Sequence, residues 1–430
     1  MASTASLAAK ILGSPMCESA AVHVFEPSGL GHRPLFMAWL LTRPPARRRW
    51  VLHTTPAARK HPKLAALLRD PPANLTVVDL PDCPFEPTRK NGFALMRHQF
   101  GKAIAYRRAW MRHARPGDTA FIPYYDDVAV ALFMAPWLSK GMPFVTLGMR
   151  AGFHRQRQGV GSAGRRVRRT EDVREFLLRR LLLRRGARFY LTNQLPLKRD
   201  VDQRWGRVAA KVRFYPDPAP TPSPLPTADA RRRLGLLPEK AIVLCYGSLT
   251  ERKGVDHLLT ALEHADWPAH AVAVCAGAYR GAVRDQLLGH RADALVARGL
   301  LARREGFVDD ATENLLFQAA TAVWLVYDGH DDMSGCLVQA GIHRRPVVAC
   351  ANGLIGWYTS LSQGGVIYDP RQPTASLARL TAMLSDADAS AAAGERLHDR
   401  FRDHTIARFR ASIHAAILGS LPAHGSSGIS

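Results

Sequence analysis

Short apolar runs alternate with segments of helical periodicity along the first half of the chain. The runs predict strands at residues 21–27, 48–55, 74–80, 118–125, 142–149, 187–193 and 211–218. The longest apolar run, residues 128–138, is well below the roughly 20 residues that a bilayer span requires, and it predicts a buried helix. Strands that alternate with helices are typical of a parallel sheet covered by helices.

A proline-rich segment then interrupts this pattern. Residues 216–227, PDPAPTPSPLPT, contain six prolines in twelve positions. Proline fixes its own φ and lacks an N–H donor, so the segment suits neither a helix nor the interior of a sheet. We therefore expect a hinge over residues 216–228, which follows a first domain over residues 20–215 and a flexible leader over residues 1–19.

The second half of the chain restarts the alternation. Strands are predicted at residues 241–249, 269–277, 302–308, 321–327, 345–351 and 364–369. Asp310-Ala-Thr-Glu313 predicts a capping box at the start of a helix. We expect a second domain over residues 229–390, one long helix over residues 391–418 and a tail over residues 419–430. The predicted fold is α/β, with two Rossmann-like, doubly wound domains that face a central cleft, where ligands bind beyond the carboxyl ends of the strands.

The positive charge of the chain belongs to its first half. Residues 1–218 contain 8 Lys and 30 Arg against 15 acidic residues, a net charge of +23, whereas residues 219–430 contain 2 Lys and 19 Arg against 21 acidic residues and are neutral. The densest run has ten Arg between Arg165 and Arg188. The apolar positions Val173, Phe176, Leu177 and Leu181 follow helical spacing within it. Such a helix could lie on an anionic membrane surface or bind a polyanion, or it could simply be solvated with its apolar stripe in the core.

The composition argues against several other classes of protein. Six scattered cysteines form no C-x-x-C pair, which argues against a disulfide framework or a zinc ribbon and fits a reducing cytoplasm. No aromatic-interleaved basic motif or recognised nucleic-acid-binding module accompanies the charge, so nucleic acid is not an expected partner. Cys245 and Cys275 lie inside apolar strands and are expected to be buried. The first residues lack the features of a signal peptide.

Two segments of the second half carry chemistry. In residues 246–262, YGSLTERKGVDHLLTAL, a strand runs into Gly247, and Lys253-Gly254 precede an apolar helix. A cation at that point faces the cleft and could neutralise a diphosphate. In residues 329–356, Ser334 and Gly335 open a helix whose free N–H groups suit a phosphate.

Together these residues resemble the retaining glycosyltransferases of the family 4 type, which have the GT-B fold. The shared features are Gly247-Ser248-Leu249 with Lys253-Gly254, then Gly306-Phe307-Val308-Asp309, then Asp331 and Gln339 at E-x7-E spacing, and finally Arg345-Pro346-Val347-Val348-Ala349. Their order and spacing agree over about 130 residues. Ser248 replaces the usual Arg, and Asp331 and Gln339 replace two Glu, so the chain is a divergent member of this pattern.

The resemblance implies roles for these residues. Lys253, helped by Arg252, would hold the donor diphosphate and stabilise the leaving group. Gly247, Ser248, Val308, Ser334 and Gly335 would contact the donor. Gln339 would bind the ribose hydroxyls, and Asp331, with Asp332 adjacent, would face the sugar. The fold usually replaces a metal ion with such cations, so neither a metal nor a cofactor is expected.

Candidates on the acceptor side come from the first half: Gly29, Gly31, His32, Asp126 and His154. Tyr124-Tyr125-Asp126-Asp127 follows a strand and could line the cleft, although a helix cap is the favoured interpretation. The resemblance implies a cytoplasmic glycosyltransferase that moves a sugar from a nucleotide-diphosphate sugar to a hydroxyl acceptor, and it alone implies retention. The charge of the first half favours an anionic glycan or a lipid-linked acceptor, with peripheral membrane contact through residues 165–188. The alternatives are a nucleotide-sugar epimerase and a catalytically inactive scaffold that binds a polyanion or a membrane.

Overall fold

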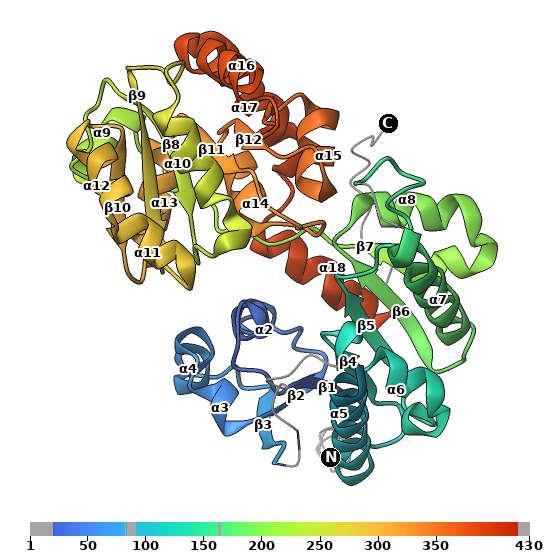
Figure 1. The fold of residues 1–430 in the computed structure, drawn as a ribbon. Helices are drawn as coiled ribbons and strands as arrows, with labels where there is room; N and C mark the ends of the chain where they lie inside the picture. Colours follow the sequence, from blue (N-terminus) through green and yellow to red (C-terminus); the bar gives the residue numbers. More distant parts are fainter. Residues whose placement is uncertain (1–19, 82, 84–91, 162–164, 420–430) are drawn as a thin grey trace, which may run out of the picture.

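The computed structural model describes residues 20–81, 83, 92–161 and 165–419, and the predicted leader and nearly all of the predicted tail lie outside this range. The chain forms two α/β domains (Figure 1). Each contains one parallel sheet, and every predicted strand is present within a few residues of its expected limits. The prediction of two Rossmann-like domains is confirmed.

The first domain contains a seven-stranded sheet of order β3-β2-β1-β4-β5-β6-β7. Its strands are β1 (Ala21–Glu26), β2 (Arg49–Thr54), β3 (Leu75–Asp79), β4 (Thr119–Ile122), β5 (Phe144–Gly148), β6 (Ala187–Thr192) and β7 (Val212–Phe214). One face packs against α5 (Gly92–His113), α6 (Ala129–Met134), α7 (Arg165–Leu182) and α8 (Leu195–Arg204). The other face packs against α2 (Arg33–Leu41), α4 (Pro62–Arg69) and α18 (Ile406–Leu418). The short elements are α3 (Pro56–Arg59), η1 (Tyr125–Asp127), η2 (Pro136–Ser139) and η3 (Gly206–Lys211).

The second domain contains a six-stranded sheet of order β10-β9-β8-β11-β12-β13. Its strands are β8 (Ala241–Tyr246), β9 (Ala271–Gly277), β10 (Leu301–Glu305), β11 (Ala322–Leu325), β12 (Val347–Ala349) and β13 (Gly365–Ile367). One face packs against α10 (Val255–Glu263), α11 (Ala282–Leu288), α12 (His290–Ala297) and α16 (Pro373–Ser385). The other packs against α9 (Thr227–Arg233), α13 (Asp310–Ala319), α14 (Gly335–Ile342), α15 (Gly353–Ser362) and α17 (Ala387–Phe401). Cys245 and Cys275 are buried in neighbouring strands, as predicted.

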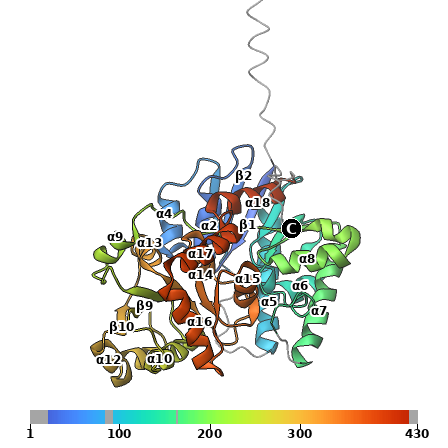
Figure 2. The ribbon, with the colours of Figure 1, turned by 90° about the horizontal axis from the view of Figure 1, so that it is seen from above.

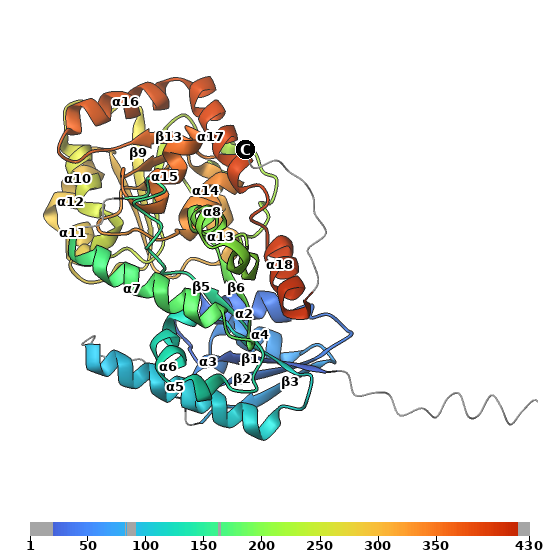
Figure 3. The same cartoon turned by 90° about the vertical axis from the view of Figure 1, so that its right-hand side faces the viewer.

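The prediction of one long helix over residues 391–418 is wrong. The chain forms α17 and then, after a break at Arg402–Thr405, a separate helix α18 that Thr405 caps through a hydrogen bond from the Arg408 N–H. The buried side chains of α18 enter the core of the first domain beside α2 (Figure 3). The predicted hinge is therefore only one of two connections between the domains. They meet where the Ala219 N–H donates a 2.9 Å bond to His404 O.

The basic segment forms α7, but its apolar positions divide in two. Leu178, Leu181 and Leu182 are buried, whereas Val173 and Phe176 are more than half exposed. The predicted stripe of Val173, Phe176, Leu177 and Leu181 therefore does not lie in the core as a unit, because the helix turns only its C-terminal half fully onto the sheet. Figure 2 shows α7 at the periphery of the first domain, next to α6 and α8. The described residues include no helix long and apolar enough to cross a membrane.

Candidate active site

A cavity of ≈ 870 Å³ lies between the domains. Its walls include residues that directly follow strands β4, β5, β6 and β8 and the end of β11, so it lies at the carboxyl ends of both sheets. This is where ligands bind in doubly wound domains. Most of the predicted site residues line it: His32, Asp126, Gly247, Ser248, Arg252, Lys253, Ser334, Gly335 and Gln339.

The remaining predicted residues lie outside the cavity wall. His154 is fully buried, and burial lowers its pKa to about 3. Val308 packs against the core of the second domain. Gly29 lies so close to α3 that a Cβ would be 3.0 Å from Ala57 O, whereas Gly31, at φ +64°, has open space around its Cα. Packing and turn geometry therefore account for these four positions.

Asp331 is also absent from the wall, and its neighbour Asp332 takes that place. Both carboxylates are held by Arg155, which comes from the loop after β5 in the first domain. Its Nη1 lies 2.9 Å from Asp331 Oδ2, and its Nη2 lies 2.6 Å from Asp332 Oδ1. Burial raises the pKa of Asp332, and Arg155 opposes that shift. A one-residue difference thus decides which carboxylate meets the cleft.

The loop after β8 places Lys253 in the cavity. The chain forms the short helix η4 (Glu251–Lys253) and then turns sharply at Gly254, which has φ +63°. A Cβ at Gly254 would lie 1.9 Å from Val326 O, so no other residue fits without displacing β11. Glycine is required here both by the left-handed conformation and by the close approach of two backbone segments.

The Lys253 ammonium group is a buried cation surrounded by neutral partners. The residue is 6% exposed. Its Nζ donates to Tyr246 O at 3.2 Å and to the Tyr327 hydroxyl, lies 3.5 Å from Cys336 Sγ and sits 4.4 Å from the centre of the Tyr327 ring. Within the described part of the chain, no carboxylate forms an ion pair with it. A buried ammonium group without an anionic partner is a strong site for a bound anion.

Arg252 provides a second cation at the same edge of the cavity. Its Nη1 lies 2.7 Å from His330 Nδ1, and its guanidinium lies 5.6 Å from the centre of the Tyr327 ring. Burial and the nearby Arg252 lower the pKa of His330 to about 4, so His330 is neutral and accepts this hydrogen bond. The positive charge of Arg252 is thus held in place without being neutralised by His330.

Helix α14 begins at the cavity. Ser334 is its N-cap residue in extended conformation, but the Ser334 side chain makes no capping hydrogen bond, contrary to the role that its residue type suggests. No heavy atom outside the local chain lies within 4 Å of the Cβ position of Gly335, so the space in front of this backbone is open. The first N–H groups of a helix have no partner within it and attract an anion.

Gln339, one turn further along α14, lies next to a carboxyl group that the sequence analysis assigned to a helix cap. Gln339 Nε2 donates to Glu313 Oε1 at 3.4 Å, while Gln339 Oε1 is buried without a partner. Burial, with a smaller effect from Asp310, raises the pKa of Glu313 to about 7.

The capping box predicted at Asp310 and Glu313 is wrong, because Asp309 caps α13 by accepting from the Thr312 N–H at 2.7 Å. Glu313 is thereby left to line the cavity.

A charged cluster forms the first-domain wall. Arg33 Nη2 donates to Asp127 Oδ1 at 3.0 Å, and Lys102 Nζ lies 2.8 Å from Asp127 Oδ2. The Arg33 guanidinium also stacks 4.1 Å from the centre of the Tyr124 ring. Behind it, Glu26 is completely buried, which raises its pKa to about 7. Arg33 lines the cavity directly after His32, although no motif in the sequence marked it as a site residue.

The interpretation of Tyr124 to Asp127 as a helix cap is also wrong. The N-cap of η1 is Tyr124, and no side chain caps it. Asp126 instead accepts a 3.0 Å hydrogen bond from the Met149 N–H, which joins the ends of β4 and β5 in the cavity wall. His32 precedes α2 and its residue is exposed at the cavity wall. Desolvation of the ring, with the nearby charges of Arg33 and Arg150, lowers its pKa to about 4, so it meets the cavity as a neutral ring.

The sequence and the structure were compared with those of known proteins. No protein-family model matches the sequence, and no curated protein matches it. The structure is similar to Anabaena HepE in complex with UDP and glucose, with a TM-score of 0.62 and 17% identity over 94% of this chain and 100% of that one. It is also similar to sucrose-phosphate synthase from Thermosynechococcus elongatus, with a TM-score of 0.63 and 16% identity over 93% and 97%.

A third similar structure is WaaG, described as a glycosyltransferase involved in lipopolysaccharide biosynthesis. Its TM-score is 0.59 and its identity 14%, over 93% of this chain and 100% of WaaG. At these identities the likeness shows the fold. Because each match extends over more than nine-tenths of this chain, both sheets and their helical layers fall within it, and the chain has the two-domain GT-B fold.

Proposed function

We propose that the protein is a glycosyltransferase that moves a sugar from a nucleotide-diphosphate donor to a hydroxyl acceptor. The observation that carries the proposal is the pairing of the buried Lys253 ammonium group with the open start of α14, in the cavity between the domains. A departing diphosphate develops negative charge on its oxygens, and fixed positive groups stabilise that charge most when they are buried.

Each part of the donor has suitable partners in the second domain. Lys253 and the first N–H groups of α14 would bind the diphosphate, with Arg252 at the edge. Gln339 and Glu313 would bind donor hydroxyls, since an amide oxygen and a carboxylate both accept from hydroxyl groups. HepE has been observed with UDP and with UDP-glucose, which makes uridine nucleotides the first candidates. Retention at the anomeric carbon follows from the family 4 resemblance and is part of the proposal.

The acceptor would enter from the first domain, which carries the whole net charge of +23. We propose an anionic or lipid-linked acceptor on this ground, because a basic surface attracts an anionic partner over long range. In this proposal Lys253 and Arg252 stabilise the negative charge of the departing diphosphate, which a bound metal ion does in other enzymes. Asp332 lines the cavity beside Ser334 and would face the transferred sugar.

We further propose that the first domain contacts an anionic membrane through an outer basic face. This face consists of the exposed residues of α5, α6, η2 and α7, which pack side by side. Large apolar side chains are exposed on it, among them Phe93, Met111, Trp137 (64% exposed) and Phe176 (55% exposed). Exposed arginines, including Arg179 and Arg180, lie on the same helices. Apolar anchors among basic residues are the composition of interfacial helices, where each cation contributes about 1 kcal/mol.

An activity assay tests the enzyme proposal. The protein is incubated with UDP-glucose and other nucleotide sugars, with and without a panel of acidic oligosaccharides and polyprenyl phosphates. We expect nucleoside diphosphate to be released together with a glycosylated acceptor. Conversion of the donor sugar without any acceptor would identify an epimerase instead. Binding of nucleotide without turnover on any donor would identify an inactive scaffold.

A further inference from the structure

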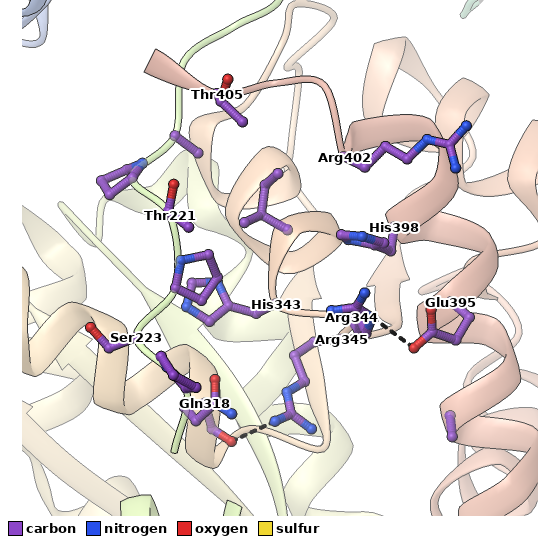
Figure 4. Close-up of a pocket in the computed structure, with 16 residues that line it drawn as sticks. Thr221, Ser223, Gln318, His343, Arg344, Arg345, Glu395, His398, Arg402 and Thr405 are labelled. Carbon is purple, nitrogen blue, oxygen red and sulfur yellow. Dashed lines mark hydrogen bonds and ion pairs between the residues drawn. The ribbon is translucent and has the colours of Figure 1, made fainter. Parts of the chain in front are cut away.

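A second cavity, of ≈ 560 Å³, lies on the hinge side of the second domain, where Pro220 lines both this cavity and the cleft. Figure 4 shows the residues that line it. Its walls come from both connections between the domains: residues 219–224 of the proline-rich segment, and Arg402 and Thr405 at the break between α17 and α18. The end of α14, the loop that follows it and one side of α17 complete the wall. We call this cavity the hinge pocket.

The wall of the hinge pocket carries more guanidinium groups than carboxylates. Arg344, Arg345 and Arg402 line it together with the carboxylate of Glu395. Burial lowers the pKa of the lining His343 to about 4, so this ring is neutral and adds no charge. Arg344 Nε lies 2.8 Å from Glu395 Oε1. Arg402 Nη1 lies 3.6 Å from Asp399 Oδ1, which is a looser ion pair. The excess of guanidinium groups over carboxylates is the arrangement that recognises phosphorylated or polycarboxylate compounds.

Arg345 is the innermost of these cations. It donates to neutral oxygens only: to Phe317 O at 3.2 Å, Gln318 O at 2.7 Å and Thr227 Oγ1 at 3.0 Å. In the part of the chain that the structure describes, no carboxylate pairs with it. Burial, with the nearby charge of Arg231, lowers its pKa to about 10, so it keeps its charge at neutral pH. A guanidinium that is desolvated without a counter-charge costs free energy unless an anion compensates it.

Arg344 adds a backbone feature. Its backbone φ is +56°, which lies in the left-handed region that non-glycine residues seldom occupy. Glycine or asparagine would be the unstrained choice at such a position, yet an arginine stands here with its guanidinium at the pocket (Figure 4). Backbone strain of this kind is unfavourable and concentrates at functional sites.

From the cavity, the uncompensated Arg345 and the strained Arg344, we propose that the hinge pocket binds a small anion with two or more negative charges, of the class of phosphorylated metabolites. The hydroxyl groups of Thr221, Ser223 and Thr405 line the same space and can donate to phosphate oxygens. Such a ligand contacts both interdomain connections at once. It also meets the C-terminal end of α14, whose N-terminal end opens on the cleft. The site is independent of the function proposed for the cleft.

The test is a calorimetric titration with inorganic pyrophosphate. The double variant Arg344→Asn and Arg402→Gln removes two guanidinium groups that are 54% and 56% exposed, and asparagine accepts the left-handed conformation, so folding is preserved. Arg298→Gln, an exposed arginine of the same domain outside the pocket, is the matched control. Lys253→Met reports separately on the cleft.

Because pyrophosphate also suits the diphosphate site proposed in the cleft, the double variant and Arg298→Gln are compared in the Lys253→Met background. There we expect the parent and Arg298→Gln to bind pyrophosphate at the hinge pocket, and the double variant to bind it at least about tenfold more weakly, since each charge-assisted hydrogen bond is worth a factor of about ten. An affinity that the double variant retains in this background overturns the proposal, as does the absence of binding to the parent or an equal loss in Arg298→Gln. A loss confined to Lys253→Met places the ion in the cleft, which overturns the hinge site and leaves the proposed donor site standing.

Discussion

Arg155 of the first domain donates a 2.6 Å hydrogen bond to Asp332 of the second domain, across the cleft. The same guanidinium also holds Asp331, so one side chain fixes the loop that precedes α14. A second contact supports it nearby, where Trp357 Nε1 donates to Gln158 O at 3.0 Å. The loop after β5 thus links the two domains at the edge of the candidate active site.

The first prediction concerns this link. In a double-mutant cycle of Arg155→Gln and Asp332→Asn, we expect a coupling free energy of about 0.5–3 kcal/mol in the free energy of unfolding, because the two groups form a close, half-buried ion pair. Denaturant unfolding of the four proteins measures it. Effects that add within about 0.3 kcal/mol would show that the pair contributes nothing to the closed arrangement of the domains.

The second prediction separates the two neighbouring carboxylates. Asp332 lines the cavity and Asp331 does not, so Asp332→Asn should lower kcat/KM at least about tenfold more than Asp331→Asn. Both substitutions weaken one bond to Arg155, which makes them matched controls for each other. Steady-state kinetics with the donor found by nucleotide screening gives the comparison. The reverse order of effects would restore Asp331 as the residue that faces the sugar.

The third prediction follows from Glu313, whose pKa is raised to about 7 by burial. An acid with a raised pKa in the folded state binds its proton more tightly there, so its contribution to stability is complete below the unfolded pKa and is lost as pH rises through about 7. Glu313→Gln keeps a neutral side chain at every pH. The stability of the variant relative to the wild type should therefore increase between about pH 5 and pH 8. Urea unfolding across this range measures it, and a constant difference would contradict the assignment.

The fourth prediction tests the turn that places Lys253. Gly254 and Gly235 have nearly equal φ values of +63° and +62°, but only at Gly254 would a Cβ collide, at 1.9 Å from Val326 O. Gly235→Ala should cost about 1–2 kcal/mol of stability for the left-handed conformation alone. Gly254→Ala should cost distinctly more and should also weaken nucleotide binding. Equal losses in thermal unfolding would mean that the close approach to β11 does not constrain the loop.

Sequence patterns predicted the strands and Lys253 because both depend on local signals. Apolar runs bounded by turn residues define the strands, and Lys253 is fixed by the strand before it and the glycine after it. The course of α18 could not be predicted in this way, because its apolar residues suit either domain and only tertiary packing selects the first. The motif favoured Asp331 over the adjacent Asp332 for a related reason, since spacing in the sequence does not say which of two neighbouring side chains lines the cavity. Glu313 was hidden because its spacing from Asp310 imitates a capping box.

The outer basic face makes a separate prediction. Sedimentation with phosphatidylglycerol vesicles at low salt should recover the protein, and neutral vesicles should not. Replacement of Trp137 and Phe176 by serine should reduce binding, because both are exposed apolar side chains on this face. Leu237→Ser, an exposed apolar residue of the neutral second domain, is the control. Failure of the wild type to bind anionic vesicles would remove the membrane contact and leave the cleft unaffected.

The proposed function depends most on Lys253 as the residue that binds the donor diphosphate. The most direct measurement is thermal unfolding with UDP, GDP, ADP and CDP at equal millimolar concentrations, on wild-type, Lys253→Met and Lys240→Met proteins. Lys240 is the other lysine of the second domain, and its Nζ donates to Ala269 O at the surface, so it is the matched control. A ligand at 100 times its Kd stabilises by about 2.7 kcal/mol. We predict that one nucleotide raises the Tm of the wild type and of Lys240→Met but does not raise the Tm of Lys253→Met. An equal rise in all three proteins, or no rise with any nucleotide, would contradict the proposed function.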